Sequence, residues 1–270
     1  MQTEKSRRRR YKRRRGHRRG IYILPNLLTT GALFFGFFSI IQASSGRFEA
    51  AAVAILIATV LDGLDGRVAR LTNTSSDFGK EYDSLSDVIC FGLAPTLVLF
   101  DWTLSSIGKI GWLCAFLYVS ATALRLARFN TQSYHNAGYF QGLPCPMAAA
   151  FLVSWMWVVE TTVGREIESL PVIATVIVVL LALGIVSAIP YPSFKNFGMK
   201  GQVPFLTSVG VVVVIALISF DPPKVVFTLV TAYLISGPVV WFGQANKRRK
   251  KKLQRQQDKE RTLPNDQDKS

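Results

Sequence analysis

The stretch LPVIATVIVVLLALGIVSAI (residues 170–189) contains no charged side chain. An α-helix needs about 20 apolar residues to cross the hydrocarbon core of a bilayer. Only helices and closed barrels can span that core, because every backbone group must find a partner inside the structure. The run is too long and too evenly apolar for a barrel strand. It therefore predicts a membrane-spanning helix.

Further apolar runs follow the same pattern, with short connections that contain turn residues such as Gly, Pro and Asn. Their ranges are 23–43, 49–66, 84–101, 109–128, 144–162, 204–220 and 225–242. We therefore expect an all-α polytopic membrane protein with about eight transmembrane helices, or six if one pair does not span.

Hydrophobic residues make up 49% of the chain and the mean hydropathy is +0.26, which excludes a soluble enzyme.

The positive charge lies at the two ends of the chain. The formal net charge is +15, of which residues 1–20 contribute +10 and residues 247–270 contribute +6. We expect a basic cytoplasmic tail (1–20), a membrane-embedded domain (21–246) and a second basic, disordered tail (247–270). Such tails contact anionic lipid or simply fix the topology. The sequence contains no folded nucleic-acid-binding domain beside these tails, so no nucleic acid is expected as a partner.

The distribution of Lys and Arg also predicts the orientation. With eight spans and a cytoplasmic N-terminus, 28 of the 32 basic residues fall on the cytoplasmic side. Cytoplasmic loops of membrane proteins carry such an excess. We therefore expect a multi-pass protein of the cytoplasmic membrane with both termini in the cytoplasm.

Four aspartates interrupt the apolar pattern at the predicted cytoplasmic ends of two neighbouring spans. Asp62 and Asp65 are three residues apart, and Asp83 and Asp87 are four apart, so each pair lies on one helix face. The connection 71–82 brings the two helices together. Charged residues in a membrane helix are costly and mark functional sites. The spacing therefore predicts four converging carboxylates at one membrane face.

Clustered carboxylates repel one another and require a cation. Oxygen ligands favour Mg²⁺, Mn²⁺ or Ca²⁺, and four aspartates could hold two ions, as in sites of phosphoryl transfer. Arg70 could reach a phosphate, and Gly66 and Gly79 would let a large ligand approach the backbone. The pattern indicates a lipid-linked diphosphate as ligand. The alternative is that Asp62 and Asp65 only pair with Arg67 and Arg70 or cap helices.

The string Asp62-x2-Asp65-Gly66-x2-Ala69-Arg70-x8-Gly79-x3-Asp83-x3-Asp87 resembles the CDP-alcohol phosphatidyltransferase motif at every position. The resemblance implies a membrane enzyme that moves a phosphatidyl group from a CDP-lipid to an alcohol and releases CMP, with its active site facing the cytoplasm. It also implies a homodimer and two bound ions, Mg²⁺ or Mn²⁺.

The resemblance also assigns roles to individual residues. Asp62, Asp65, Asp83 and Asp87 would be metal ligands, and Asp87 would also act as the general base. The contacts to the CDP-lipid would come from six residues: Gly66, Arg70, Gly79, Ser76, Asn26 and Thr29.

Several strings are similar to the phosphatidylserine synthase branch of this family. They are LPNLLTT (24–30), LRLARFN (124–130), GLPCP (142–146) and YPSFK (191–195). The resemblance implies L-serine as the acceptor. Arg125, Arg128 and Asn130 lie at the predicted cytoplasmic end of one span, where an arginine could bind the serine carboxylate. The same arginines could instead bind the diphosphate or only set the topology.

Two alternatives stay open at this point. The first keeps the chemistry and replaces serine with glycerol 3-phosphate or an inositol phosphate. The second is a divalent-cation transporter that uses the four aspartates as its ion site. The three cysteines have no metal-ligand spacing, and we expect them to be small buried residues.

Overall fold

The computed structural model describes residues 23–72, 74–131, 139–192 and 205–241. The predictions for the tails 1–20 and 247–270 and for the connection with Lys195 and Lys200 fall outside the described residues. Nearly all of the described chain is helical, which confirms the predicted all-α class.

Each of the eight predicted runs contains a helix. The helices are α2 (Ile23–Ser44), α3 (Phe48–Leu71), α4 (Asp77–Asp87), α5 (Ala94–Trp102), α6 (Lys109–Thr131), α7 (Cys145–Thr162), α8 (Leu170–Val186), α9 (Phe205–Phe220) and a final helix, Pro222–Trp241. Five segments are long and apolar enough to span a membrane: α2, Asp77–Trp102, α6, α7 and the final helix. Because α3 carries the acidic motif and α8 and α9 have only 17 and 16 residues, their predicted spanning stays a prediction.

The helices that carry the aspartates extend further than the apolar pattern predicts. α3 continues five residues past 66, and α4 begins at Asp77, seven residues before 84. The earlier start has a local cause, because the Ser76 hydroxyl accepts a hydrogen bond of 3.0 Å from the backbone N–H of Gly79. A serine cap of this kind satisfies one of the free N–H groups of the first turn.

α4 continues through a π-helical turn, η1 (Val88–Leu93), into α5 without a break. Two glycines allow this turn to pack closely between α2 and α6. A Cβ on Gly36 of α2 would lie 2.8 Å from the Cys90 Sγ, and one on Gly92 would lie 3.3 Å from the Thr122 side chain of α6. The close approach of α2 and α6 therefore fixes the segment that follows Asp87.

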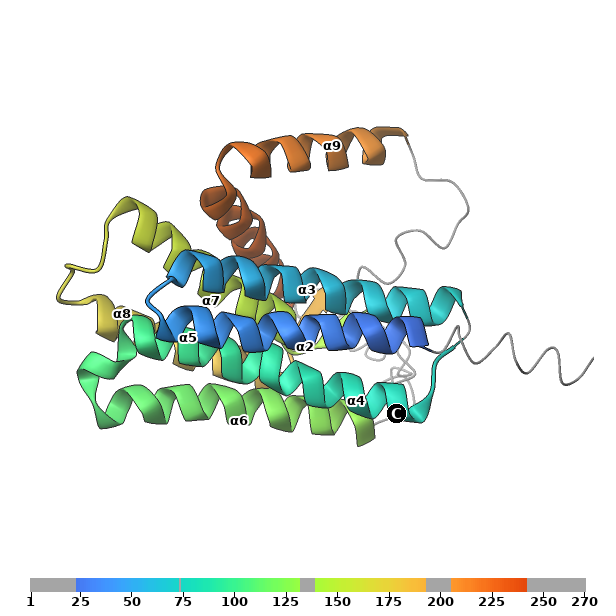
Figure 1. The fold of residues 1–270 in the computed structure, drawn as a ribbon, viewed down its shortest axis with the longest axis horizontal. Helices are drawn as coiled ribbons and strands as arrows, with labels where there is room; N and C mark the ends of the chain where they lie inside the picture. Colours follow the sequence, from blue (N-terminus) through green and yellow to red (C-terminus); the bar gives the residue numbers. More distant parts are fainter. Residues whose placement is uncertain (1–22, 73, 132–138, 193–204, 242–270) are drawn as a thin grey trace, which may run out of the picture.

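The helices are arranged so that the motif residues gather at one end of the bundle. Figure 1 shows α2, α3, the α4–α5 segment and α6 side by side, with the start of α2, the end of α3, the start of α4 and the end of α6 at the same end. Small buried residues in α3 permit this packing: Ala51, Ala52, Ala54 and Ala58. Small residues let membrane helices approach closely.

The opposite end of the bundle contains a polar cluster around η2 (Leu104–Ile107). The Trp102 indole N–H donates to the Glu160 carboxylate at 2.7 Å, and Arg165 pairs with the same carboxylate at 3.0 Å. The Arg165 guanidinium also lies 4.7 Å from the centre of the Phe48 ring. These contacts join the ends of α5 and α7 to the start of α3, far from the aspartates.

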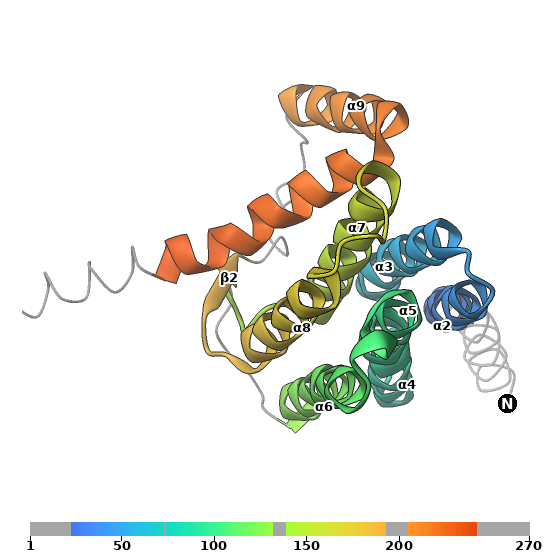
Figure 2. The same cartoon turned by 90° about the vertical axis from the view of Figure 1, so that its left-hand side faces the viewer.

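The C-terminal part is arranged differently from the bundle. Strands β1 (Tyr139–Gln141) and β2 (Pro190–Pro192) form a short antiparallel pair that the sequence did not predict. The final helix runs beside β2 and α7, and α9 stands away from the bundle (Figure 2). Phe227 contacts Phe151 of α7, with ring centres 5.4 Å apart.

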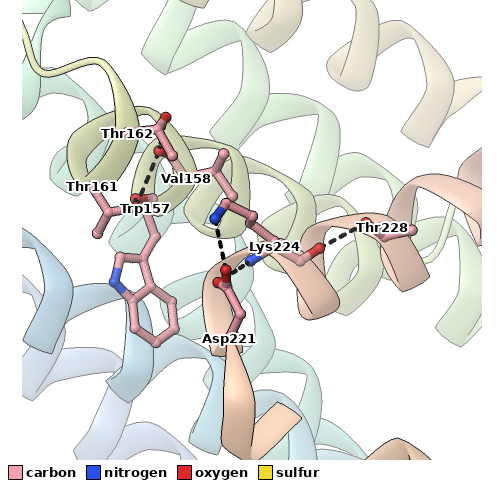
Figure 3. Close-up of polar contacts among 7 residues, drawn as sticks. All are labelled: Trp157, Val158, Thr161, Thr162, Asp221, Lys224 and Thr228. Atoms are coloured by element: carbon pink, nitrogen blue, oxygen red, sulfur yellow. Dashed lines mark hydrogen bonds and ion pairs between the residues drawn. The ribbon is translucent and has the colours of Figure 1, made fainter. Parts of the chain in front are cut away.

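A polar turn begins the final helix. The Lys224 ammonium donates to the Asp221 carboxylate at 2.7 Å, and the Lys224 backbone N–H donates at 3.3 Å (Figure 3). The hydrogen bonds to Lys224 lower the pKa of Asp221 below its usual value. Because Lys224 is exposed and Asp221 is only partly buried, this ion pair contributes little to stability.

Candidate active site

Three of the four predicted aspartates converge. Asp62 comes from α3, and Asp83 and Asp87 come from successive turns of α4. Each offers a carboxylate oxygen, and these three oxygens lie within 4.8 Å of one another. All three side chains are half-buried. Two helices thus present three carboxylates to one small volume, as their spacing predicts.

The donor set fits a divalent metal ion. One oxygen of Asp83, Oδ1, is buried and has no hydrogen-bond partner. Native proteins rarely leave a buried polar atom without a partner. The group contains only carboxylate oxygens, which are the ligands that Mg²⁺ and Mn²⁺ prefer. The residues therefore fit the predicted class of cofactor.

Asp65 lies beside this group with a different partner. Its side chain is only 5% exposed, and its Oδ2 accepts a hydrogen bond of 2.6 Å from the Thr29 hydroxyl of α2. Asp65 is close enough to Asp83 for the two carboxylates to interact electrostatically. The sequence predicted Asp65 as a metal ligand and Thr29 as a contact to the CDP-lipid. In the structure, Asp65 and Thr29 form a direct hydrogen bond with each other.

The glycines of the motif have different surroundings. Gly66 is exposed, and a Cβ there would meet nothing within 4 Å. This is the open backbone that a bulky ligand would need. Gly79 differs, because a Cβ there would lie 3.1 Å from the Ser76 Oγ and 3.3 Å from the Asn26 Oδ1. A side chain at Gly79 would therefore crowd Ser76 and Asn26, which are predicted contacts of the same ligand, and the role of Gly79 in binding stays a prediction.

The arginines of the motif do not neutralise the aspartates. Arg67 and Arg70 are exposed near the end of α3. Within the described chain, the ion pairs are Lys80–Asp77, Arg165–Glu160 and Lys224–Asp221. None of them joins a motif aspartate to an arginine, so the alternative of simple surface ion pairs is wrong for the described residues.

The three residues of α6 that the sequence predicts to bind serine differ in their exposure. Arg125 is half-buried, whereas Arg128 and Asn130 are exposed. The Asn130 amide donates to Ser84 at 3.0 Å and to Glu81 at 3.3 Å, so it joins the end of α6 to α4. Arg125 is the one of the three that faces the interior.

The surroundings of Arg125 were not predicted. Its Nη1 lies 3.5 Å from the Sγ of Cys145, which begins α7, and its buried Nε has no hydrogen-bond partner. The Cys145 sulfur is also close enough to Asp87 to interact with it electrostatically. The sequence analysis treated Cys145 only as a small buried residue, although it lies within the string GLPCP. No local pattern indicated its contact with an arginine 20 positions earlier.

Comparison with known proteins agrees with this geometry. The model of the CDP-alcohol phosphatidyltransferase family matches residues 22–189. The chain is 38% identical over 223 residues to a Helicobacter pylori protein named CDP-diacylglycerol–serine O-phosphatidyltransferase, covering 82% of this chain and 92% of that protein.

Two archaeal relatives are also similar. A Methanocaldococcus jannaschii protein with the same name is 37% identical over 53% of this chain and 63% of its own length. An archaetidylserine synthase of Methanothermobacter thermautotrophicus is 34% identical over 65% of this chain and 72% of its own. The helical fold, the converging carboxylates and these matches together place the chain in the CDP-alcohol phosphatidyltransferase family.

Proposed function

We propose that this protein transfers a phosphatidyl group from CDP-diacylglycerol to L-serine and releases CMP. The convergence of Asp62, Asp83 and Asp87 at one end of a membrane bundle carries the proposal for the chemistry. The relatives support the acceptor, because their names share serine while the lipid differs between diacylglycerol and archaeol types. The lipid chains of the substrate would lie in the bilayer.

The four aspartates would hold two divalent ions, Mg²⁺ or Mn²⁺. Asp62, Asp83 and Asp87 are already grouped, and Asp65 is next to Asp83. When bound, such ions neutralise the diphosphate and stabilise the phosphate of the departing CMP. The open backbone at Gly66 leaves room for the diphosphate beside the aspartates. Arg70, Ser76, Asn26 and Thr29 lie on the three helix ends around it and would contact the CDP moiety.

Asp87 would act as the general base. In a direct displacement, the serine hydroxyl oxygen forms a bond to the β-phosphorus, which bears the lipid, as the bond between that phosphorus and the CMP oxygen breaks. The hydroxyl proton passes to the Asp87 carboxylate. Asp87 lies deepest along α4, next to η1 and near Cys145, on the side of the site that contains Arg125.

Arg125 would bind the serine carboxylate. Its Nε is buried without a partner, and no carboxylate pairs with it among the described residues. A guanidinium binds a carboxylate through two parallel hydrogen bonds. The exposed Arg128 would contribute charge at the rim, and the excess of basic residues on this side supports an active site that faces the cytoplasm.

The experiment uses purified full-length protein in detergent with CDP-diacylglycerol, labelled L-serine and Mn²⁺ or Mg²⁺. We expect labelled lipid and CMP in equal amounts, and neither product after addition of EDTA. CMP release that requires glycerol 3-phosphate or an inositol phosphate in place of serine would overturn the acceptor and keep the chemistry. Asp87→Asn should abolish turnover in folded protein, and near-normal activity in that variant would exclude Asp87 as the base.

A further inference from the structure

The Arg125 guanidinium, near the end of α6, is held on one side only. Its Nη1 donates a hydrogen bond to the Cys145 Sγ at 3.5 Å, whereas its Nε is buried and has no hydrogen-bond partner. A guanidinium carries its five N–H groups in one rigid plane. Nε and Nη2 form one edge of this plane, and Nη1 lies outside that edge. The contact with Cys145 therefore leaves the edge that contains Nε for another partner.

The Nε edge suits a carboxylate. A guanidinium can bind a carboxylate through two parallel hydrogen bonds, here one from Nε and one from Nη2. Native proteins rarely leave a buried polar atom such as the Arg125 Nε without a partner. Such recognition needs a guanidinium that is already correctly oriented. The Cys145 sulfur is a weak acceptor, but its hydrogen bond is the one described for Arg125.

The Cys145 side chain has a fixed place. It is fully buried and belongs to the first turn of α7. Pro146 follows it in the same turn, where a proline suits the start of a helix because the missing N–H would have no partner there. Leu143, two residues earlier, is also buried. The position of the sulfur is therefore set by how the chain enters α7.

The corner that leads into α7 (residues 142–144) is bound to the end of α8. The Gly142 N–H donates to the Ile189 carbonyl at 2.9 Å, and the Leu143 N–H donates to the Gly184 carbonyl at 3.0 Å. Gly142 has a φ of +78°, which favours glycine. A Cβ there would lie only 2.5 Å from the Ile185 carbonyl oxygen. The corner thus approaches α8 as closely as the backbone allows.

The strand that follows α8 is fixed as well. β2 pairs with β1, which comes directly before the corner, so that Gln141 lies opposite Pro190. Tyr191 of β2 is buried, and its ring lies 5.8 Å from that of Tyr233 in the final helix. Figure 2 shows the final helix running beside β2. The support of the corner, and with it the start of α7, is therefore held by several elements.

We propose that Cys145 is a positioning residue for Arg125 and that the 142–144 corner places it. The inference rests on the proposed function, because Arg125 is there the group that binds the acceptor carboxylate. Cys145 accepts from Nη1 and so fixes the rotation of the guanidinium plane. The Nε edge is then directed toward the carboxylate before the acceptor arrives.

The test measures KM for each substrate separately in full-length protein. Cys145→Ala removes the acceptor of Nη1, so KM for serine should rise about fivefold, the effect of one lost hydrogen bond, with KM for CDP-diacylglycerol unchanged. Cys145→Ser keeps an acceptor and should raise KM for serine less. Cys114→Ala makes the same change at a partly buried cysteine of α6 and should leave both KM values unchanged.

A double variant asks whether Cys145 acts through Arg125. Arg125→Gln removes the guanidinium, so adding Cys145→Ala to it should change KM for serine little further. An equal effect of Cys145→Ala in both backgrounds would overturn the inference. So would a rise in KM as large in Cys145→Ser as in Cys145→Ala, or a loss of thermal stability with no selective change in KM for serine.

The corner is tested by a pair of glycine variants. Gly142→Ala should lower Tm and raise KM for serine, because relief of the clash with α8 must move the start of α7. Gly164 also has a positive φ, +79°, but open space around it, so Gly164→Ala should lower Tm and leave KM for serine unchanged. Folded Gly142→Ala protein with a normal KM for serine would refute the role of the corner.

The wild-type protein separates this inference from the proposed function. Wild-type protein that uses a different acceptor would refute the serine assignment, and the same variants would then be tested with that acceptor. A selective rise in its KM in Cys145→Ala, absent in the Arg125→Gln background, would still support the positioning role. Wild-type protein that releases no CMP with any acceptor would overturn both proposals.

Discussion

The Thr29 hydroxyl donates a hydrogen bond of 2.6 Å to the Asp65 carboxylate, and this bond connects the first turns of α2 to the motif on α3. Asp65 is nearly fully buried, so it depends on this donor more than an exposed carboxylate would. The Thr29 Oγ1 also lies 3.1 Å from the Pro25 carbonyl oxygen, which keeps the hydroxyl on the inner side of α2. Thr29 therefore helps to fix the orientation of a predicted metal ligand.

Thr29→Val should reduce activity, whereas Thr29→Ser should keep most of it. Valine has nearly the same shape but removes the donor, which leaves the Asp65 Oδ2 without its side-chain partner. A lost hydrogen bond to a charged group costs about 1.5–3 kcal/mol, so kcat/KM should fall by about tenfold or more. The measurement is CMP release at saturating metal.

Thr30→Val is the matched control for this prediction. Thr30 is the next residue and also makes a side-chain contact to α4, at 2.9 Å to the Tyr82 hydroxyl, but it does not contact an aspartate. We expect nearly normal activity from it. Equal losses in the two valine variants would indicate that α2 packing, and not the bond to Asp65, matters.

Divalent metal should stabilise the folded protein. Three carboxylates within 4.8 Å of one another repel until a cation is bound. A ligand at about 100 times its Kd stabilises the native state by about 2.7 kcal/mol. Addition of Mn²⁺ should therefore raise Tm in a thermal unfolding experiment, and EDTA should reverse the rise.

Asp83→Asn should change both the Tm of the metal-free protein and the rise in Tm that Mn²⁺ causes. Removing one of the repelling charges should raise the Tm of the metal-free protein, and removing one ligand should shrink the increase caused by Mn²⁺. Asp77→Asn is the control on the same helix, because Asp77 is exposed and its ion pair within the described residues is with Lys80. A metal-induced rise that is equally large in Asp83→Asn would contradict the assignment of Asp83 as a ligand.

The helices and the convergence of the aspartates could be predicted from the sequence, because apolar runs and spacings of three and four residues are local patterns. The start of α4 was missed, because hydropathy identifies the apolar part of a helix and not the Ser76 cap that begins it. The partner of Thr29, the contact of Arg125 with Cys145 and the place of Tyr233 depend on tertiary packing between distant segments. A single sequence contains no local signal for such contacts.

Gly66→Ala should make the fold slightly more stable and weaken the binding of CDP-diacylglycerol. Alanine is favoured over glycine in a helix by about 0.5–1 kcal/mol, and the new Cβ would meet no protein atom, so the fold should be slightly more stable. The same methyl group would project into the space proposed for the diphosphate. We expect a higher KM for CDP-diacylglycerol, measured at saturating serine.

Gly63→Ala is the matched control for Gly66→Ala. Gly63 lies one turn earlier on α3 and also has open space around it, but it is not part of the motif. It should show the same gain in Tm with an unchanged KM for CDP-diacylglycerol. A parallel rise in KM for both variants would place the lipid-linked substrate along the whole exposed face of α3.

Gly36→Ala should lower both stability and activity, although Gly36 is not a predicted site residue. The added Cβ would lie 2.8 Å from the Cys90 Sγ and 3.0 Å from its Cα, and overpacking of this kind costs about 1–3 kcal/mol. Cys90 belongs to the π-helical turn that follows Asp87, so relief of the clash must move this turn and with it the proposed base. We expect a lower Tm and a lower kcat, measured in the same preparation.

Two further variants decide whether that effect acts through Cys90. Gly210→Ala introduces the same change in α9, where a Cβ meets no neighbour, so it should raise Tm slightly, as at Gly66, and leave kcat unchanged. Adding Cys90→Ala to Gly36→Ala removes the clash with the sulfur but not the one with the backbone, so it should restore part of both values. If Gly36→Ala alone were fully active and stable, the turn after Asp87 could shift without consequence. Its tight packing between α2 and α6 would then have no role in positioning the base.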